Sequence, residues 1–204
     1  LPDLIQLLPA SMAAGLIFGL VGVLFMHCLR ATARYANTSP MSPNSRIMFA
    51  AIITGVIGTF IPEVLGLGGE TITAILAQSF GLTYLVVIFL LKIGLTSLCI
   101  GFGLFGGVFS PALFVGTAAG AIIGKICAFI GLSSASLILP FCGMAAVGGA
   151  VIGAPVTAVL IILEITVASL PTTAFFASIS YQDEDNWSFL TNFVIVRGLI
   201  LLLK

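Results

Sequence analysis

The chain has 204 residues, of which 60% are hydrophobic and only 7% are charged, and its formal net charge at pH 7 is zero. A soluble globular domain carries about 25% charged residues, so lipid must surround most of this surface. The balanced charge also lacks the clustered Lys and Arg that nucleic-acid binding requires. We therefore expect a multi-pass integral membrane protein that does not bind nucleic acid.

The residue types that carry enzymatic chemistry are sparse and scattered. The four cysteines form no CxxC pair and lie near no histidine cluster, a pattern typical of small buried apolar residues rather than of metal ligands. No Ser/His/Asp or Cys/His arrangement, P-loop or dinucleotide-binding fingerprint occurs in the sequence. We expect no catalytic residues, no bound metal and no cofactor, and hence no enzyme.

The first apolar segment covers residues 4–29 and predicts a helix of about 39 Å, enough to cross a bilayer at a tilt. Arg30 and Arg34 mark its expected end. Residues 31–46 are rich in Asn, Ser and Pro and predict a loop. This loop carries arginine but no acidic residue, which indicates the cytoplasmic side of the membrane.

Two short segments and one full span follow. Residues 47–61 form an apolar segment that Pro62 ends, shorter than the roughly 20 residues of a complete crossing. A glycine-rich break at 66–69 precedes a short segment that runs to Phe80. Residues 82–100 are long and apolar enough to predict a transmembrane helix.

The remaining chain continues the pattern of short helices interrupted by glycine and proline. Residues 101–107 are dense in glycine, and further helices are predicted over 112–130, 137–152 and 156–169. The sequence therefore predicts an all-α membrane protein with short, broken and tilted helices. In such proteins the broken ends commonly lie at an ion or substrate site, because an open backbone in the bilayer needs protein or water around it.

One of these helices has glycines at a regular spacing. Gly116, Gly120 and Gly124 recur every four residues and so share one helix face. Small residues at this spacing let two helices approach closely in membranes, so we expect a tightly packed neighbour there.

Two ionisable residues lie inside apolar segments. Placing a charged side chain in the bilayer costs free energy, so such residues are often functional. We expect Lys92 to reach an interface with its ammonium group or to pair with an acid; the alternative is that it raises the local positive potential for anions. Glu164 is the second of these residues, and the readings open for it are a structural role with a buried polar partner and a proton relay.

The stretch Gly106–Pro111 carries the most chemical information. Its two glycines allow a sharp turn, and Pro111 suits the first turn of a following helix, where its missing N–H would have no partner. The amides of Val108 and Phe109 then lie at the start of that helix. Free N–H groups and the positive end of the helix dipole can hold an anion there, weakly enough to let it leave again. Taken alone, the same pattern also fits an ordinary helix start.

This stretch, Gly-Gly-Val-Phe-Ser-Pro, resembles the GxFxP motif of the CLC family of voltage-gated chloride channels and chloride/proton antiporters. Residues 143–146, 153–158 and 163–166 are similar to the family's GMAA…xAPLT…LEMT block, in the same order and at the usual separation. The resemblance covers about residues 1–170. It assigns them to the C-terminal half of a membrane domain built from two inverted halves.

The resemblance implies a homodimer in the lipid bilayer, with one anion pathway in each subunit. It implies that chloride is bound by the backbone amides of Val108 and Phe109, and that the phenyl ring of Phe109 helps to wall the pathway. Four residues would shape the turn: Gly106, Gly107, Ser110 and Pro111. The implied function is transmembrane chloride transport; whether by a channel or a chloride/proton antiporter stays open.

The chain departs from the family pattern in two places. The first-half motifs GSGIP and GREGP or GKEGP do not occur in it, so we expect it to be a piece of a longer protein. Residues 171–204 form a divergent segment, expected to be an acidic loop and an apolar helix. Tyr181 is the candidate for the tyrosine hydroxyl that the family offers to chloride, but three consecutive acids follow it closely and would repel an anion.

Two other functions remain as alternatives. One is a different broken-helix secondary transporter, which for an organic solute should show more polar side chains at its breaks than the Gly, Pro and apolar residues seen here. The other is a non-conducting truncated fragment that only associates with partners. An upstream reading frame with the GSGIP and gating-glutamate motifs would argue against that fragment.

Overall fold

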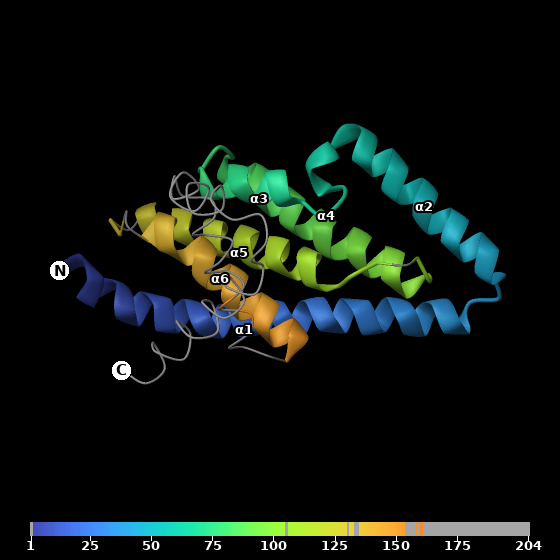
Figure 1. Cartoon of the computed structure of the whole chain (residues 1–204), viewed down its shortest axis with the longest axis horizontal. Coiled ribbons are helices and arrows are strands. Elements are labelled where there is room, and N and C mark those ends of the chain that lie inside the picture. Colours follow the sequence, from blue (N-terminus) through green and yellow to red (C-terminus); the bar gives the residue numbers. More distant parts are fainter. Residues whose placement is uncertain are drawn as a thin grey trace, which may run out of the picture. The chain divides into compact units, whose positions relative to one another are not determined.

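The computed structural model describes residues 2–104, 106–129, 131–132, 135–153, 158 and 160 (Figure 1). Leu1–Ile162 forms one compact unit, and a second unit, Leu163–Lys204, lies outside the described residues. The regular elements described are all helical, which confirms the predicted fold class. They are α1 (Pro2–Thr38), α2 (Pro43–Phe60), the 3₁₀ helix η1 (Pro62–Val64), α3 (Gly69–Leu76), α4 (Leu82–Gly101), α5 (Phe109–Phe129) and α6 (Ala135–Ile152).

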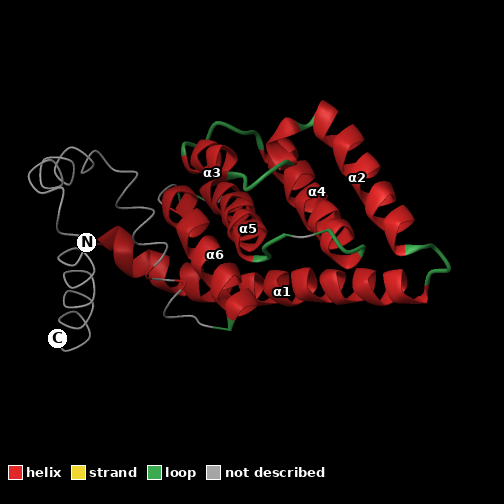
Figure 2. Cartoon of the chain, turned by 45° about the vertical axis from the view of Figure 1, so that its right-hand side comes forward, coloured by secondary structure: helices red, strands yellow, loops and turns green. Residues whose placement is uncertain are grey.

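Among the described residues, four helical stretches are long and apolar enough to cross a membrane. They are Ala13–Thr38 of α1, α4, α5 and α6. The helices α2 and α3 lie on the outer side of α4 and α5, and α1 runs along the other side of the group (Figure 2). The chain is thus a polytopic helical membrane protein.

The centre of the unit is α5. Every residue from Ala112 to Ala121 is buried, because α1, α3, α4 and α6 all pack around this helix. Both views show α5 between α4 and α6 (Figures 1 and 2). A helix that is apolar on all sides suits this place, since no face of it meets water.

The glycine face of α5 packs directly on α6, as predicted. A Cβ atom on Gly116 would collide with the backbone carbonyl of Gly143, and a Cβ on Gly143 would collide with that of Gly116. At Gly120 the obstructing atoms belong to the backbone of Leu139 and Pro140. The two backbones therefore touch, and only glycine allows this approach.

The first helix is longer than the sequence predicted. The loop expected over residues 31–46 is confined to Ser39–Ser42, because α1 continues to Thr38. Ala36 is 2% exposed and packs in a cluster with Ala50 and Phe102, and the hydroxyl of Thr32 donates to the carbonyl of Cys28 at 2.8 Å. The helix thus continues past the arginines, where Ala36 packs against Ala50 of α2 and against Phe102 just after α4.

The other boundaries follow the local signals more closely. Ser42 caps α2 by accepting a hydrogen bond from the amide of Ser45 at 3.4 Å, and Pro62 ends the segment as predicted. The glycine-rich break is confirmed, with Gly66 and Gly68 at φ values of 61° and 76°. The next short helix, α3, ends at Leu76, four residues before the predicted end, and most of the helix predicted over 156–169 lies outside the described residues.

Candidate functional site

The turn Gly106–Pro111 leads into the buried helix α5. Val108 is the residue just before the helix, and its carbonyl accepts the first helical hydrogen bond, from the amide of Ala112 at 3.1 Å. Phe109 is the first helical residue, three residues earlier than the sequence predicted. Pro111 is the third and so lies in the first turn, where its missing N–H leaves no bond unmade.

Three backbone amides at this helix start have no intrahelical acceptor. The N–H groups of Val108, Phe109 and Ser110 donate no hydrogen bond to another described residue. Such groups carry the positive end of the helix dipole and bind anions without a charged side chain. The sequence interpretation named the first two amides and missed Ser110, because it began the helix three residues later. Pro111 already indicated a helix start near these residues, because proline favours the first turn, but the predicted helix range began after it.

The residues of this turn have different surroundings. The ring of Phe109 is half-buried against Leu113 and Met144, and it lies 3.8 Å from where a Cβ on Gly148 would be. Val108 packs against the main core. Gly106 and Gly107 are exposed in the described unit. The side chains of Val108 and Phe109 thus anchor the turn, while Gly106 and Gly107 are exposed.

Ser110 makes a contact that the sequence did not reveal. Its hydroxyl donates to the backbone carbonyl of Leu67 at 2.6 Å, in the loop between η1 and α3. The two residues are 43 positions apart. The first turn of α5 is therefore tied to the glycine-rich loop.

Lys92 lies in α4 and is buried, which corrects the expectation that it reaches a membrane interface. Only 3% of the residue is exposed. Its ammonium donates to the carbonyls of Val64 at 2.8 Å and Gly66 at 3.0 Å, and it lies 4.8 Å from the ring centroid of Phe114. Its partners in the described structure are carbonyls and a ring rather than the acid that was expected, because α4 packs beside this loop.

Two candidate residues fall outside the described part of the chain. They are Tyr181, the candidate anion ligand, and Glu164, the residue expected to be structural or a proton relay. Both stay predictions.

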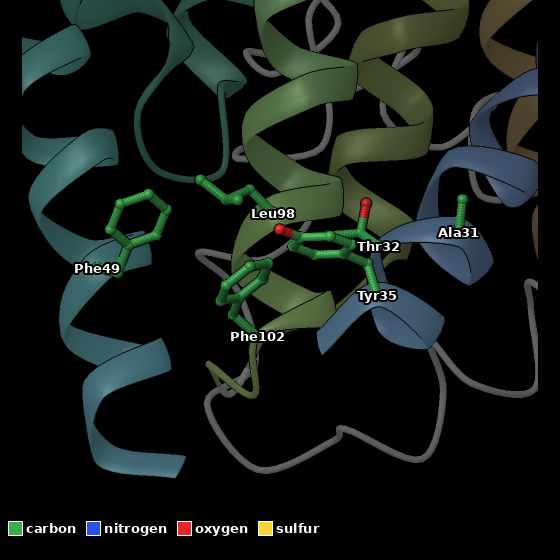
Figure 3. Close-up of a pocket in the computed structure, with 6 residues that line it drawn as sticks. All are labelled: Ala31, Thr32, Tyr35, Phe49, Leu98 and Phe102. Atoms are coloured by element: carbon green, nitrogen blue, oxygen red, sulfur yellow. The ribbon is translucent and has the colours of Figure 1, made fainter. Parts of the chain in front are cut away.

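A hollow elsewhere in the unit has the wrong chemistry for an anion (Figure 3). Its volume is about 380 Å³, and it opens between α1, α2 and α4. The rings of Tyr35 and Phe49 lie 6.5 and 6.1 Å from that of Phe102, and the hydroxyl of Thr32 is already bonded within α1. The lining residues are Ala31, Thr32, Tyr35, Phe49, Leu98 and Phe102. The aromatic walls make an apolar notch, so the turn before α5 remains the anion-site candidate.

Comparison with known proteins identifies the family. Residues 3–182 match the family described as "Voltage gated chloride channel". The chain belongs to this family. It is 31% identical over 159 residues to proteins named "Voltage-gated ClC-type chloride channel ClcB" from Escherichia coli O9:H4 strain HS and from Escherichia coli strain K12 / DH10B. The match covers 76% of this chain and 37% of each relative, so the chain spans well under half of their length.

Membership agrees with the sequence analysis. The predicted resemblance to the chloride-channel family is confirmed over most of the chain, including the turn before α5. Together with the four apolar helices, it makes the chain part of a multi-pass integral membrane protein.

Proposed function

We propose that this chain forms part of a membrane protein that transports chloride, and that the amides of Val108, Phe109 and Ser110 bind the ion. The observation that carries the proposal is the cluster of three N–H groups with no hydrogen-bond acceptor among the described residues, at the start of α5, a buried helix long and apolar enough to cross a membrane. Membership of the chloride-channel family and the ClcB names of the relatives support chloride as the ion.

Binding by amides suits transport better than binding by a side-chain charge. Neutral dipoles hold a halide firmly enough to replace part of its water shell, yet weakly enough to release it. The first turn of α5 contains no acidic residue to repel the anion. We propose further that two such subunits associate as a homodimer with a pathway in each. Channel and antiporter both fit this binding mode.

The amide of Phe109 offers a sharp test in liposomes that hold the protein at its natural length. Phe109→Pro removes one N–H at the first helical position, where proline is best tolerated. Phe109→Ala is the matched control, because it also loses the ring but keeps the N–H. A hydrogen bond to a charged group contributes about 1.5–3 kcal/mol, so chloride affinity should fall about tenfold or more in the proline variant relative to the alanine variant.

The measurement is chloride efflux from vesicles as a function of chloride concentration. Equal chloride affinity in the two variants would show that the Phe109 amide does not bind the ion. A wild-type protein that moves no chloride would overturn the function itself, and would favour the other transporter or the non-conducting fragment.

A further inference from the structure

The loop between η1 and α3 is held by two side chains from different helices. The ammonium of Lys92 in α4 donates hydrogen bonds to the carbonyls of Val64 and Gly66, and the hydroxyl of Ser110 in α5 donates one to the carbonyl of Leu67. Three carbonyls within four consecutive residues are therefore bonded to side chains rather than to other backbone groups. Such a loop is fixed in place from two sides.

The contacts of Lys92 account for its burial. A buried ammonium is costly unless its donors find partners, and it has three of them to satisfy. The carbonyls of Val64 and Gly66 accept two, and the face of Phe114 lies at 4.8 Å, within the range of a cation–π interaction. Within the described residues its hydrogen bonds go to these two carbonyls only, so its main partner is the loop.

The loop also packs directly against α5. Gly68 has a φ of 76°, and a Cβ atom on it would lie 2.6 Å from Cδ2 of Phe114. Phe114 is itself fully buried, so its ring cannot move aside easily. The loop therefore touches α5 at Ser110 in its first turn and at Phe114 in the next.

We propose that Lys92 and Ser110 are positioning residues for the anion site, and that they act together through the Val64–Gly68 loop. Ser110 supplies a backbone amide to the site, and its hydroxyl bonds to the carbonyl of Leu67, the residue that directly follows Gly66, whose carbonyl is bonded to Lys92. Lys92 thus sets the orientation of the first turn of α5 without touching the anion. This inference rests on the proposed anion site and deepens it.

A double-mutant cycle on chloride affinity tests the coupling. The variants are Lys92→Met, which keeps the length of the side chain but removes the ammonium, Ser110→Ala, which removes only the hydroxyl, and the two combined. Each single change should weaken chloride binding about threefold to tenfold. The double variant should be scarcely weaker than the worse single one, because both changes release the same loop.

Two further variants separate positioning from other effects. Lys125→Met removes a positive charge near the other end of α5, about 24 Å along the helix from Phe109, and should leave chloride affinity unchanged. Ser110→Thr keeps the hydroxyl and should restore wild-type affinity. If Lys92→Met does not fold, the comparison of Ser110→Ala with Ser110→Thr still decides whether the hydroxyl matters.

The experiment is a titration of the purified natural-length protein with potassium chloride in a calorimeter, beside its thermal unfolding. Lower thermal stability with unchanged chloride affinity would show a merely structural clamp and overturn the inference. Effects of Lys92→Met and Ser110→Ala that multiply in the double variant would also overturn it, because they would then act independently. A wild-type protein that binds no chloride would refute the proposed site as well, whereas normal wild-type binding with unaffected variants refutes this inference alone.

Discussion

The break between η1 and α3 depends on single residues with unusual backbone conformations. Gly66 and Gly68 both have positive φ angles, a region that residues with a Cβ enter at a cost. At Gly68 the ring of Phe114 also occupies the space that a side chain would need. Gly68 is therefore constrained twice, once by its own backbone and once by α5.

Gly68→Ala is expected to destabilise the protein by about 2–6 kcal/mol, because a left-handed backbone and an overpacked ring contact each cost about 1–3 kcal/mol. Gly69→Ala is the control, because nothing lies within 4 Å of its added methyl group and its φ is not positive. Thermal unfolding in detergent measures both. Equal midpoints for the two variants would contradict the strain assigned to Gly68.

Residue-scale prediction from sequence succeeded where the signal was local. Pro111 and the preceding glycines place a turn and a helix start by their own backbone restrictions. Lys92 could not be assigned from sequence, because its partners are backbone carbonyls 28 and 26 residues away that bear no side-chain signature. The contact of Ser110 with Leu67 was hidden for the same reason.

At the scale of elements, the contact of α5 with α6 organises the unit. Gly116 and Gly143 face each other so closely that the backbones touch, and Gly120 lies against the backbone of Leu139 and Pro140. Without a hydrophobic effect between helices in lipid, close packing of this kind stabilises their association. It also holds the helix whose first turn forms the anion site.

Gly116→Ala is expected to cost about 1–3 kcal/mol, because the new methyl group meets a backbone carbonyl that cannot rotate away. Gly94→Ala in α4 is the matched control, since nothing lies within 4 Å of its added methyl group. We expect the midpoint of thermal unfolding to fall by several degrees for the first variant and to stay near wild type for the second. A tolerated Gly116→Ala would contradict the backbone contact.

Helix boundaries, like the contacts of single residues, could be predicted from the sequence only where the signal is local. The start of α2 at Pro43 and the end before Pro62 follow local capping and proline signals. The end of α1 did not, since Ala36 is held by Phe102 and Ala50 from distant parts of the chain. The arginines that seemed to mark a loop are simply on the exposed side of a longer helix.

At the scale of the whole molecule, the described unit leaves large apolar side chains uncovered. On α1 they include Leu16, Leu20 and Val23, which are 77%, 69% and 67% exposed. Such surface is compatible with lipid or with further protein, and not with water. Composition alone predicted this class, because 7% charged residues cannot cover a soluble surface.

The central claim is that an anion binds at the start of α5, and the position of a bound halide tests it most directly. We suggest crystallising the natural-length protein in bromide and collecting data at the bromine absorption edge. The account predicts an anomalous peak within hydrogen-bonding reach of the amides of Val108, Phe109 and Ser110. Ordered bromide at other places in the membrane part, with none at this turn, would contradict it.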